Sequence, residues 1–225
     1  MRSAGVLRFV GHCMGHLKTV AVLNAKGGVG KTLLTTQLAV RAVNDHNLVA
    51  VIDLDPSGGT KKWIGARSKH DIDAPTFFSG VSDPEEAIQA ADLAGYEIAF
   101  LDGAPGTLTA TETVIGQADV VVIPEKSSND DMGNAVLVAT LAVAAGKPIV
   151  VAINDVPKRS DQGDYQRSKA EGLAKAIRAR FKCSVVMICN RDQYLMTRDE
   201  GIGVYELTGS GSRHAKSEID ELYNA

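Results

Sequence analysis

The segment Ala25-Lys26-Gly27-Gly28-Val29-Gly30-Lys31-Thr32 decides how this chain of 225 residues folds. An apolar run at residues 19–23 precedes the segment, and apolar residues spaced four apart follow it at Leu34, Leu38 and Ala42. This order predicts a buried strand, a glycine loop and a helix, which is the context of a phosphate-binding loop. Glycines let the backbone turn its N–H groups toward a phosphate, and the helix adds its positive N-terminal end.

Two side chains of this loop carry specific chemistry. We expect Lys31 to reach the β- and γ-phosphates of a nucleotide and the hydroxyl of Thr32 to ligate Mg²⁺. The simpler alternative is a glycine-rich turn with solvated lysines. A strand before the loop and a helix after it favour the phosphate-loop interpretation.

The loop resembles the deviant Walker A motif of the ParA/MinD family of ATPases, because Lys26 directly precedes Gly27. The resemblance implies that Lys26 reaches across an ATP-driven homodimer to the partner's nucleotide, as an arginine finger does. Relatives have a threonine where this chain has Leu33, so we expect a missing hydroxyl contact and a lower affinity. The implied nucleotide-binding residues of the loop are Lys26, Gly27, Gly28, Val29, Gly30, Lys31, Thr32 and Leu33.

Acidic residues end two further apolar runs. Asp53-Leu54-Asp55-Pro56 follows one run, and Asp102 follows another at residues 98–101. Carboxyl ends of parallel strands form the ligand-binding edge of an open α/β sheet, and a carboxylate there can hold Mg²⁺. The resemblance places Asp53 with Asp102 on the Mg²⁺ side, and it makes Asp55 the residue that orients the attacking water. The predicted catalytic residues are therefore Lys26, Lys31 and Asp55.

Two asparagines complete the predicted nucleotide site. Asn154 ends an apolar run at residues 149–153, and Asn190 follows another at residues 185–189. By the resemblance, Asn154 contacts the adenine ring and Asn190 belongs to the loop that closes over the base. An asparagine at a strand end is also a routine turn residue.

The remaining patterns predict an α/β fold of the P-loop NTPase type, with a doubly wound, mostly parallel sheet flanked by helices. Residues 1–17 are expected to be a disordered extension that precedes a single ATPase domain at 18–225, and residues 60–84 are expected to be rich in turns. Six strands are expected at residues 19–23, 48–53, 98–102, 120–124, 149–153 and 185–189. Later helices are expected at residues 84–93, 132–145, 166–181 and 216–223.

Bulk properties point to a globular protein of the cytoplasm. Hydrophobic residues make up 44% of the chain and charged residues 23%, and no apolar run is long enough to span a bilayer. The end of the chain, residues 218–225, is acidic, which argues against binding to anionic lipid. Three scattered cysteines, Cys13, Cys183 and Cys189, fit a reducing compartment better than a disulfide framework.

A basic stretch stands out in this otherwise slightly acidic chain. Residues 158–182 contain eight lysines and arginines against three acidic residues, while the whole chain has a net charge of −3. For any single residue the simpler interpretation is an exposed, solvated helix face, but the local excess favours contacts to DNA phosphates. The candidate DNA contacts are Lys158, Arg159, Arg167, Lys169, Lys175 and Arg178, with Arg191 and Arg198 further along the chain.

These features predict an ATPase that uses ATP/ADP and Mg²⁺, dimerises with ATP and binds nonspecific DNA at the nucleoid. The resemblance implies a role in plasmid or chromosome partitioning, with a centromere-binding adaptor that stimulates hydrolysis. A ParA-like accessory ATPase of conjugative or T-DNA transfer remains the alternative, and one sequence does not separate the two.

Overall fold

The computed structural model describes residues 16–225 except 73, 107, 128–132 and 159–163. Its strands form a seven-stranded sheet in the order β3-β2-β4-β1-β5-β6-β7, and every neighbouring pair is parallel. The predicted doubly wound parallel sheet is thereby confirmed. The strands are β1 Lys18–Val22, β2 Val49–Asp53, β3 Thr76–Ser79, β4 Ile98–Asp102, β5 Val120–Lys126, β6 Ile149–Val156 and β7 Ser184–Cys189.

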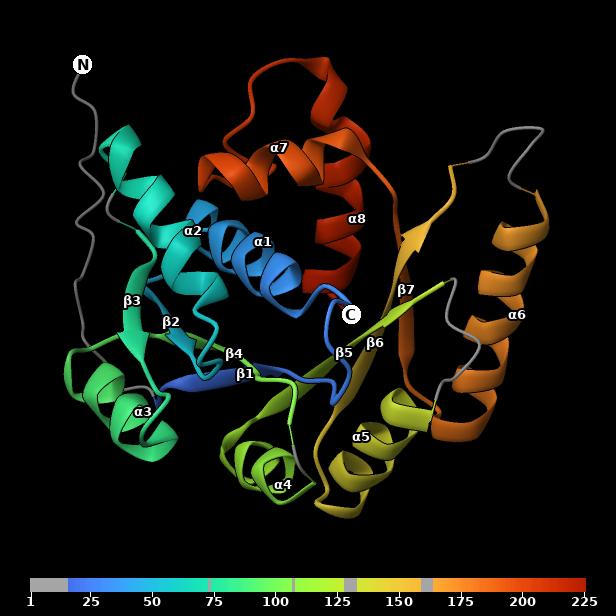
Figure 1. Cartoon of the computed structure of the whole chain (residues 1–225), viewed down its shortest axis with the longest axis horizontal. Coiled ribbons are helices and arrows are strands. Elements are labelled where there is room, and N and C mark those ends of the chain that lie inside the picture. Colours follow the sequence, from blue (N-terminus) through green and yellow to red (C-terminus); the bar gives the residue numbers. More distant parts are fainter. Residues whose placement is uncertain (1–15, 73, 107, 128–132, 159–163) are drawn as a thin grey trace, which may run out of the picture.

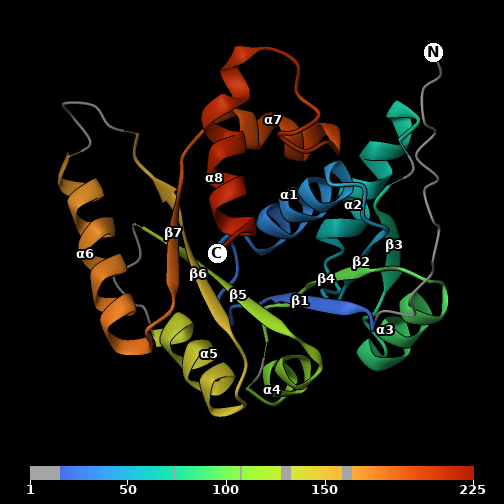
Figure 2. The same ribbon diagram turned by 180° about the vertical axis from the view of Figure 1, so that it is seen from behind.

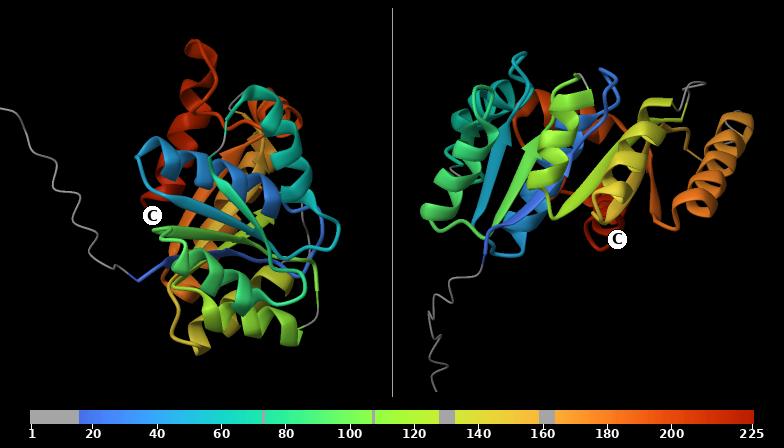
Figure 3. Two further views of the ribbon diagram at one scale, coloured as in Figure 1. Left: turned by 90° about the vertical axis from the view of Figure 1, so that its left-hand side faces the viewer. Right: turned by 90° about the horizontal axis from the view of Figure 1, so that it is seen from below.

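Helices cover both faces of the sheet, and each face has its own apolar core (Figures 1 and 2). Figure 3 shows the strands between the two helix layers. One face carries α1 Lys31–Asn44, α2 Gly59–Arg67, α7 Asp192–Glu200 and α8 Arg213–Tyr223. The other face carries α3 Pro84–Leu93, α4 Leu108–Gln117, α5 Gly133–Ala144 and α6 Asp164–Phe181.

The prediction of turns at residues 60–84 was wrong, because this region contains α2 and the edge strand β3. The four residues of β3 are too few to show a periodic pattern, and the strand pairs with β2 alone among the described strands. Helix α2 has two glycines and a weak apolar pattern, so its sequence does not predict a helix. The carboxylate of Asp53 stabilises the first turn of α2 by accepting a hydrogen bond from the backbone N–H of Lys61, at 3.0 Å.

The strand order places a binding edge at the carboxyl end of β1. Strand β1 lies between β4 and β5, and the chain builds the sheet on one side of β1 before it crosses to the other. Such a switch point is where open α/β sheets bind ligands. The register sets Asp102 beside Val22 on one side and beside Asp53 on the other, so the two predicted metal ligands are neighbours.

At the start of the domain, Leu17 is 2% exposed and its backbone N–H donates to the carboxylate of Asp92. The residue therefore belongs to the folded domain, although the sequence placed it in the extension. Of the rest of that expected extension, His16 is exposed and residues 1–15 lie outside the described residues. In the part of the chain that the structure describes, no helix combines the length and apolar character needed to cross a membrane.

Shortening Leu101 to alanine should destabilise the fold strongly, because this side chain of the interior strand β4 is 0% exposed. We expect Leu101→Ala to lower the free energy of unfolding by about 2–5 kcal/mol through reduced burial and a residual cavity. Leu93→Ala is the matched control, since Leu93 is 89% exposed, and it should change stability by less than about 0.5 kcal/mol. Urea denaturation of both variants measures the difference, and equal destabilisation would contradict the assignment of the core.

Candidate functional site

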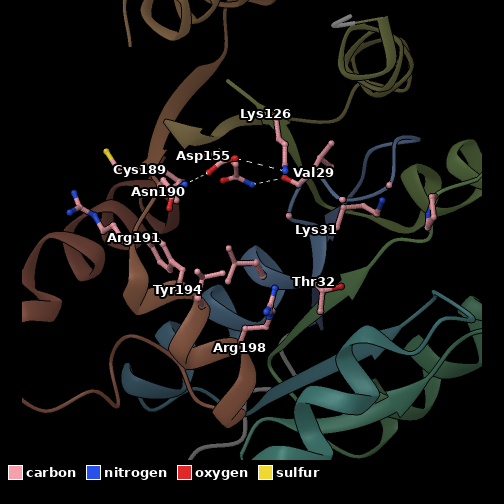
Figure 4. A pocket seen from close by; sticks show the side chains of 18 of the residues that line it. Val29, Lys31, Thr32, Lys126, Asp155, Cys189, Asn190, Arg191, Tyr194 and Arg198 are labelled. Carbon is pink, nitrogen blue, oxygen red and sulfur yellow. Dashed lines mark hydrogen bonds and ion pairs between the residues drawn. The ribbon is translucent and has the colours of Figure 1, made fainter. Parts of the chain in front are cut away.

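A cavity of about 660 Å³ opens at the carboxyl ends of the strands, above the glycine loop. Figure 4 shows Lys31 and Thr32 at one end and Cys189, Asn190 and Arg191 at the other. Residues 27–33 of the loop form its floor. Its other lining residues are Asp55, Ser57, Pro105, Lys126, Asn154, Asp155, Ile188, Cys189, Asn190, Arg191, Tyr194, Leu195 and Arg198.

The loop conformation depends on glycine. Gly28 and Gly30 have φ angles of 72° and 102°, in the left-handed region that favours glycine. A Cβ on Gly30 would lie 2.4 Å from the side-chain nitrogen of Asn154. That nitrogen donates a hydrogen bond to the carbonyl of Val29 at 2.7 Å, so β6 supports the loop from below. The conformation of the loop is therefore fixed by its glycines and by Asn154, and its binding of phosphate stays a prediction.

Lys31 is 6% exposed and fixed by the backbone of its own loop. Its ammonium donates to the carbonyls of Asn24 at 3.0 Å and Lys26 at 2.9 Å. Burial lowers the pKa of this ammonium, and the charges of Asp102 and Asp55 act in the opposite direction. An ammonium has three donors, so Lys31 keeps one for a phosphate oxygen.

Asp102 and Thr32 form the candidate metal site. The Asp102 carboxylate is 0% exposed, and its Oδ2 accepts hydrogen bonds from the hydroxyls of Thr32 at 2.7 Å and Thr60 at 2.8 Å. Burial raises its pKa to about 6, against the two hydroxyl hydrogen bonds that lower it. A carboxylate and a hydroxyl beside a phosphate loop suit the hard cation Mg²⁺, which completes its shell with phosphate oxygens and water. Bound there, Mg²⁺ would neutralise charge on the β- and γ-phosphates.

Asp53 lies next to Asp102 but serves the local backbone. Its Oδ1 accepts from the N–H of Asp55 and its Oδ2 from the N–H of Lys61, both at 3.0 Å. The side chain is 2% exposed, its pKa is raised by burial, and it is absent from the described lining of the cavity. Its role as a metal ligand stays a prediction.

Asp55 reaches the cavity that Asp53 does not. Its Oδ1 accepts a hydrogen bond from the N–H of Ser57 at 2.8 Å, which fixes the carboxylate at the end of β2. The other oxygen can accept a hydrogen bond from a water at the phosphate end of the cavity. This geometry fits the predicted role of orienting the attacking water.

Sequence reasoning missed Asp155 at the opposite end. This residue has a φ of 61° and lies at an irregularity between β6 and β7. Its carboxylate accepts a hydrogen bond from Asn190 at 2.7 Å and lies 3.8 Å from the ammonium of Lys126 (Figure 4). Its position directly after Asn154 at a strand end was the available signal. The structure thus brings Asn154 and Asn190 to one cavity, and the contact of Asn154 with the adenine ring and the place of Asn190 in a loop over the base stay predictions.

Lys26 is exposed and does not belong to the cavity lining described for its own chain. That placement suits a lysine that acts on a partner's nucleotide, although this role stays a prediction. Arg191 and Arg198 line the cavity, and Arg191 donates to the Glu218 carboxylate at 2.6 Å and 3.0 Å. These two arginines therefore lie at the cavity, apart from the basic helix α6.

The other candidate DNA contacts fall into two groups. Lys158, Lys169 and Lys175 are exposed on or before α6. Arg167 pairs with Glu171, and Arg178 donates to the carbonyl of Val185. Arg159 lies outside the described residues.

Comparison with known proteins identifies the family. A profile of the CobQ/CobB/MinD/ParA nucleotide binding domain matches residues 20–193, most of the chain. The chain belongs to this family. The resemblance of its phosphate loop to ParA/MinD ATPases is thereby confirmed, and the protein is a P-loop ATPase of this group.

Two curated relatives show how the similarity is distributed. Maintenance of carboxysome distribution protein A from Halothiobacillus neapolitanus is 25% identical over 213 residues, which cover 92% of this chain and 94% of the relative. The chromosome-partitioning ATPase Soj from Thermus thermophilus is 26% identical over 153 residues, which cover 56% and 61%. Similarity to the first relative therefore runs through nearly the whole domain.

Solved structures with low sequence identity share the fold. The ATP complex of McdA from Cyanothece superposes with a TM-score of 0.71 at 17% identity, covering 93% of this chain and 96% of the other. The MinD cell division protein from Aquifex aeolicus gives 0.67 at 16% identity, covering 92% and 97%.

The raised pKa of Asp102 predicts a pH-dependent affinity for magnesium. A metal ligand must be deprotonated, so a carboxyl with a pKa of about 6 holds Mg²⁺ more weakly as the pH falls below that value. From pH of about 7.5 to about 5, we expect the apparent Mg²⁺ affinity of the nucleotide complex to fall about tenfold through this group.

Calorimetric or fluorescent Mg²⁺ titration in the presence of nucleotide measures this change. Asp102→Asn should bind Mg²⁺ weakly and should lose that part of the pH dependence. Asp119→Asn changes a carboxylate that accepts hydrogen bonds from Thr19 at the other end of β1, and this variant should keep the full pH dependence of Mg²⁺ affinity. Titration of the nucleotide itself affects all variants alike and cancels in the comparison, so identical profiles would exclude Asp102.

Proposed function

We propose that this protein hydrolyses Mg-ATP, dimerises in the ATP state and binds nonspecific DNA in order to partition a plasmid or chromosome. The observation that carries the proposal is one cavity lined by the glycine loop, Lys31, Thr32 and Asp55, with the buried carboxylate of Asp102 accepting a hydrogen bond from the Thr32 hydroxyl. Each of these groups meets one need of phosphoryl transfer: phosphate binding, charge neutralisation and orientation of the attacking water.

The residues of the chain divide this work by position. Lys31 contributes its remaining donor to the phosphates while its backbone partners hold it in place. Asp55 accepts a hydrogen bond from the attacking water and directs it toward the γ-phosphorus. Lys26 of the second subunit adds positive charge where negative charge spreads in the transition state, so hydrolysis requires the dimer. Hydrolysis stays slow until an adaptor bound to the cargo stimulates it.

Binding to DNA follows from the exposed lysines near α6. Lys158, Lys169 and Lys175 present positive charge, and contacts to DNA phosphates need no groove-reading element. A dimer doubles this surface, so weak contacts on each subunit add together. We place the protein in the cytoplasm, at the nucleoid.

The cargo has two further candidates. A protein compartment is favoured by the relatives named for carboxysome distribution, which match over more than nine-tenths of both chains. A relaxase–DNA complex of conjugative or T-DNA transfer would use the same ATPase cycle. The gene next to this one distinguishes the three cargoes. An adaptor that binds a centromere would indicate partitioning of DNA, a shell-associated protein would indicate a protein compartment, and a relaxase would indicate DNA transfer.

Two substitutions in the cavity should separate nucleotide binding from hydrolysis. Lys31→Ala removes the buried point charge at the phosphates, so we expect nucleotide binding to fall below detection. Asp55→Ala leaves that charge in place, so we expect binding within about threefold of the wild type and turnover reduced by about 10²-fold. Glu86→Ala, an exposed residue of α3, is the control for removal of a carboxylate.

Fluorescent-nucleotide titration and phosphate release measure the two quantities. Turnover by Asp55→Ala equal to that of the wild type would disprove the role of Asp55. If neither the wild type nor Glu86→Ala hydrolyses ATP in the presence of Mg²⁺, the ATPase proposal is wrong.

Affinity for random-sequence duplex DNA should require ATP and should fall steeply with salt. Replacing Lys158, Lys169 and Lys175 together by alanine should lower the log–log salt slope by about 0.9 for each phosphate that is no longer neutralised, while ATP-driven dimerisation persists. Replacing Lys18, Lys62 and Lys69, which are exposed elsewhere, removes the same charge and is the matched control. Lys26→Ala should bind ATP but neither dimerise nor bind DNA.

Sedimentation with ADP, ATP and a nonhydrolysable analogue, followed by DNA binding at several salt concentrations, measures both steps. An ATP dimer without affinity for DNA would leave the ATPase assignment intact and overturn the DNA-partition proposal. Equally weakened DNA binding in both lysine triples would place the DNA-binding surface somewhere other than α6.

A further inference from the structure

Helix α2 connects the phosphate end of the cavity with a buried arginine at its other end. Its first turn contacts the metal side, because the Thr60 hydroxyl donates to Asp102 and the Lys61 N–H donates to Asp53. The loop before it carries Asp55, whose carbonyl accepts a hydrogen bond from the N–H of Gly58 at 2.9 Å. The first turn of α2 is thus bonded both to β2 and to the loop that carries Asp55.

The far end of α2 is held by Arg67, which is 1% exposed. Its guanidinium donates to both oxygens of Glu206, at 2.8 Å and 2.5 Å, and to the carbonyls of Ala74 at 2.6 Å and Gly201 at 3.1 Å. The same group lies 5.0 Å from the ring centre of Trp63. Four of its five N–H donors therefore have partners in a fixed, planar arrangement.

Glu206 and Gly201 belong to the segment that follows α7, a helix lining the other end of the cavity. Gly201 lies directly on α2, since a Cβ there would be 2.2 Å from the backbone nitrogen of Arg67. Glu206 also accepts a hydrogen bond from the N–H of Gly203 at 2.7 Å, which fixes the segment itself. The segment is tied in turn to α1, because Gln37 accepts from the N–H of Val204 at 2.7 Å.

These contacts serve placement more than core formation. Among the described residues of α2, Trp63 is the one large apolar side chain that is buried, and the other two buried residues are Thr60 and Arg67. A helix with so little apolar burial depends on the polar contacts at its two ends for its orientation. A buried ion pair by itself is a weak source of stability compared with apolar residues of similar size. The arrangement instead gives one defined geometry, since a bidentate pair fixes direction as well as distance.

We propose that Arg67 and Glu206 form a positioning pair for ATP hydrolysis: by fixing α2 against the segment after α7, they hold Asp55 where it orients the attacking water. The inference rests on the proposed ATPase function and adds two residues to it that touch neither nucleotide nor metal. Disruption of the pair should affect the hydrolytic step more than the binding of nucleotide, because the glycine loop and Lys31 are held by β1, β6 and α1.

The test compares Glu206→Gln with Asp220→Asn, two substitutions that each remove one carboxylate from a partly buried arginine pair. Asp220 of α8 accepts from Arg41 of α1 at 2.6 Å, and Arg41 lies 5.1 Å from the ring centre of Tyr205, so this pair joins α8 to α1 and to the segment after α7 but does not hold α2. With Mg-ATP we expect Glu206→Gln to lower kcat about 10- to 100-fold while KM changes less than about threefold. Asp220→Asn should leave kcat within about twofold. Arg67→Lys, which keeps the charge but removes the fork, should lower kcat as Glu206→Gln does.

A second measurement reports on placement without any need for turnover. Amide hydrogen exchange of Gly58, Lys61 and Lys62, whose N–H groups bond to Asp55, Asp53 and Gly58, should be at least tenfold faster in Glu206→Gln than in Asp220→Asn. Thermal unfolding of both variants establishes that each remains folded at the assay temperature.

Each outcome decides a separate question. If the wild type hydrolyses ATP and Glu206→Gln matches it in kcat and in exchange, the positioning inference is wrong. If both carboxylate variants lower kcat equally, the effect reflects general destabilisation and the inference is also wrong. If the wild type hydrolyses no ATP, the proposed function fails, and the exchange experiment alone decides whether the pair positions the loop that carries Asp55.

Discussion

The buried carboxylate of Asp102 is the constraint on which the site depends. One of its oxygens accepts hydrogen bonds from the hydroxyls of Thr32 on α1 and Thr60 on α2, so it joins the first turns of two helices at the end of β4. Hydrogen bonds to a charged group contribute about 1.5–3 kcal/mol each, and a carboxylate buried without them would destabilise the fold. The buried carboxylate of Asp102 therefore needs the hydroxyls of Thr32 and Thr60 as hydrogen-bond donors. Asp102 itself is buried because it ends β4 directly beside the glycine loop.

The sequence was most informative where a residue type is required by backbone or charge. Gly28 and Gly30 need left-handed backbone angles, Asp102 ends an apolar run, and the helix predicted at residues 84–93 coincides with α3 Pro84–Leu93. Strands of the sheet centre were likewise predictable, because burial on both faces makes them continuous apolar runs. Each of these features depends on a few neighbouring residues of the chain.

The parts that could not be predicted depend on contacts between segments far apart in the chain. Helix α2 and strand β3 have weak patterns of their own and are stabilised by Asp53, Arg67 and the neighbouring strand β2. Helix α7 was not predicted from the sequence, and its burial of Tyr194 and Thr197 shows that it packs on the domain. The sequence placed Asp155 next to Asn154, but its contacts with Asn190 and Lys126 depend on a left-handed backbone at an irregularity between β6 and β7. Arg191 and Arg198 were assigned by charge alone, which does not say on which surface a cation lies.

The parallel pairing of β1 has a consequence for how the protein is made. Lys18 pairs with Ile98, and Val20 pairs with Val120, so the strand before the glycine loop finds both neighbours only some eighty to one hundred residues later. Pairing over such separations must overcome a large loop-closure entropy before the contacts form, which slows folding. As the chain leaves the ribosome, its nucleotide loop is translated early but cannot be enclosed until β5 and β6 have emerged. A nascent chain therefore gains the ability to bind nucleotide late in synthesis, long after the glycine loop itself has been translated.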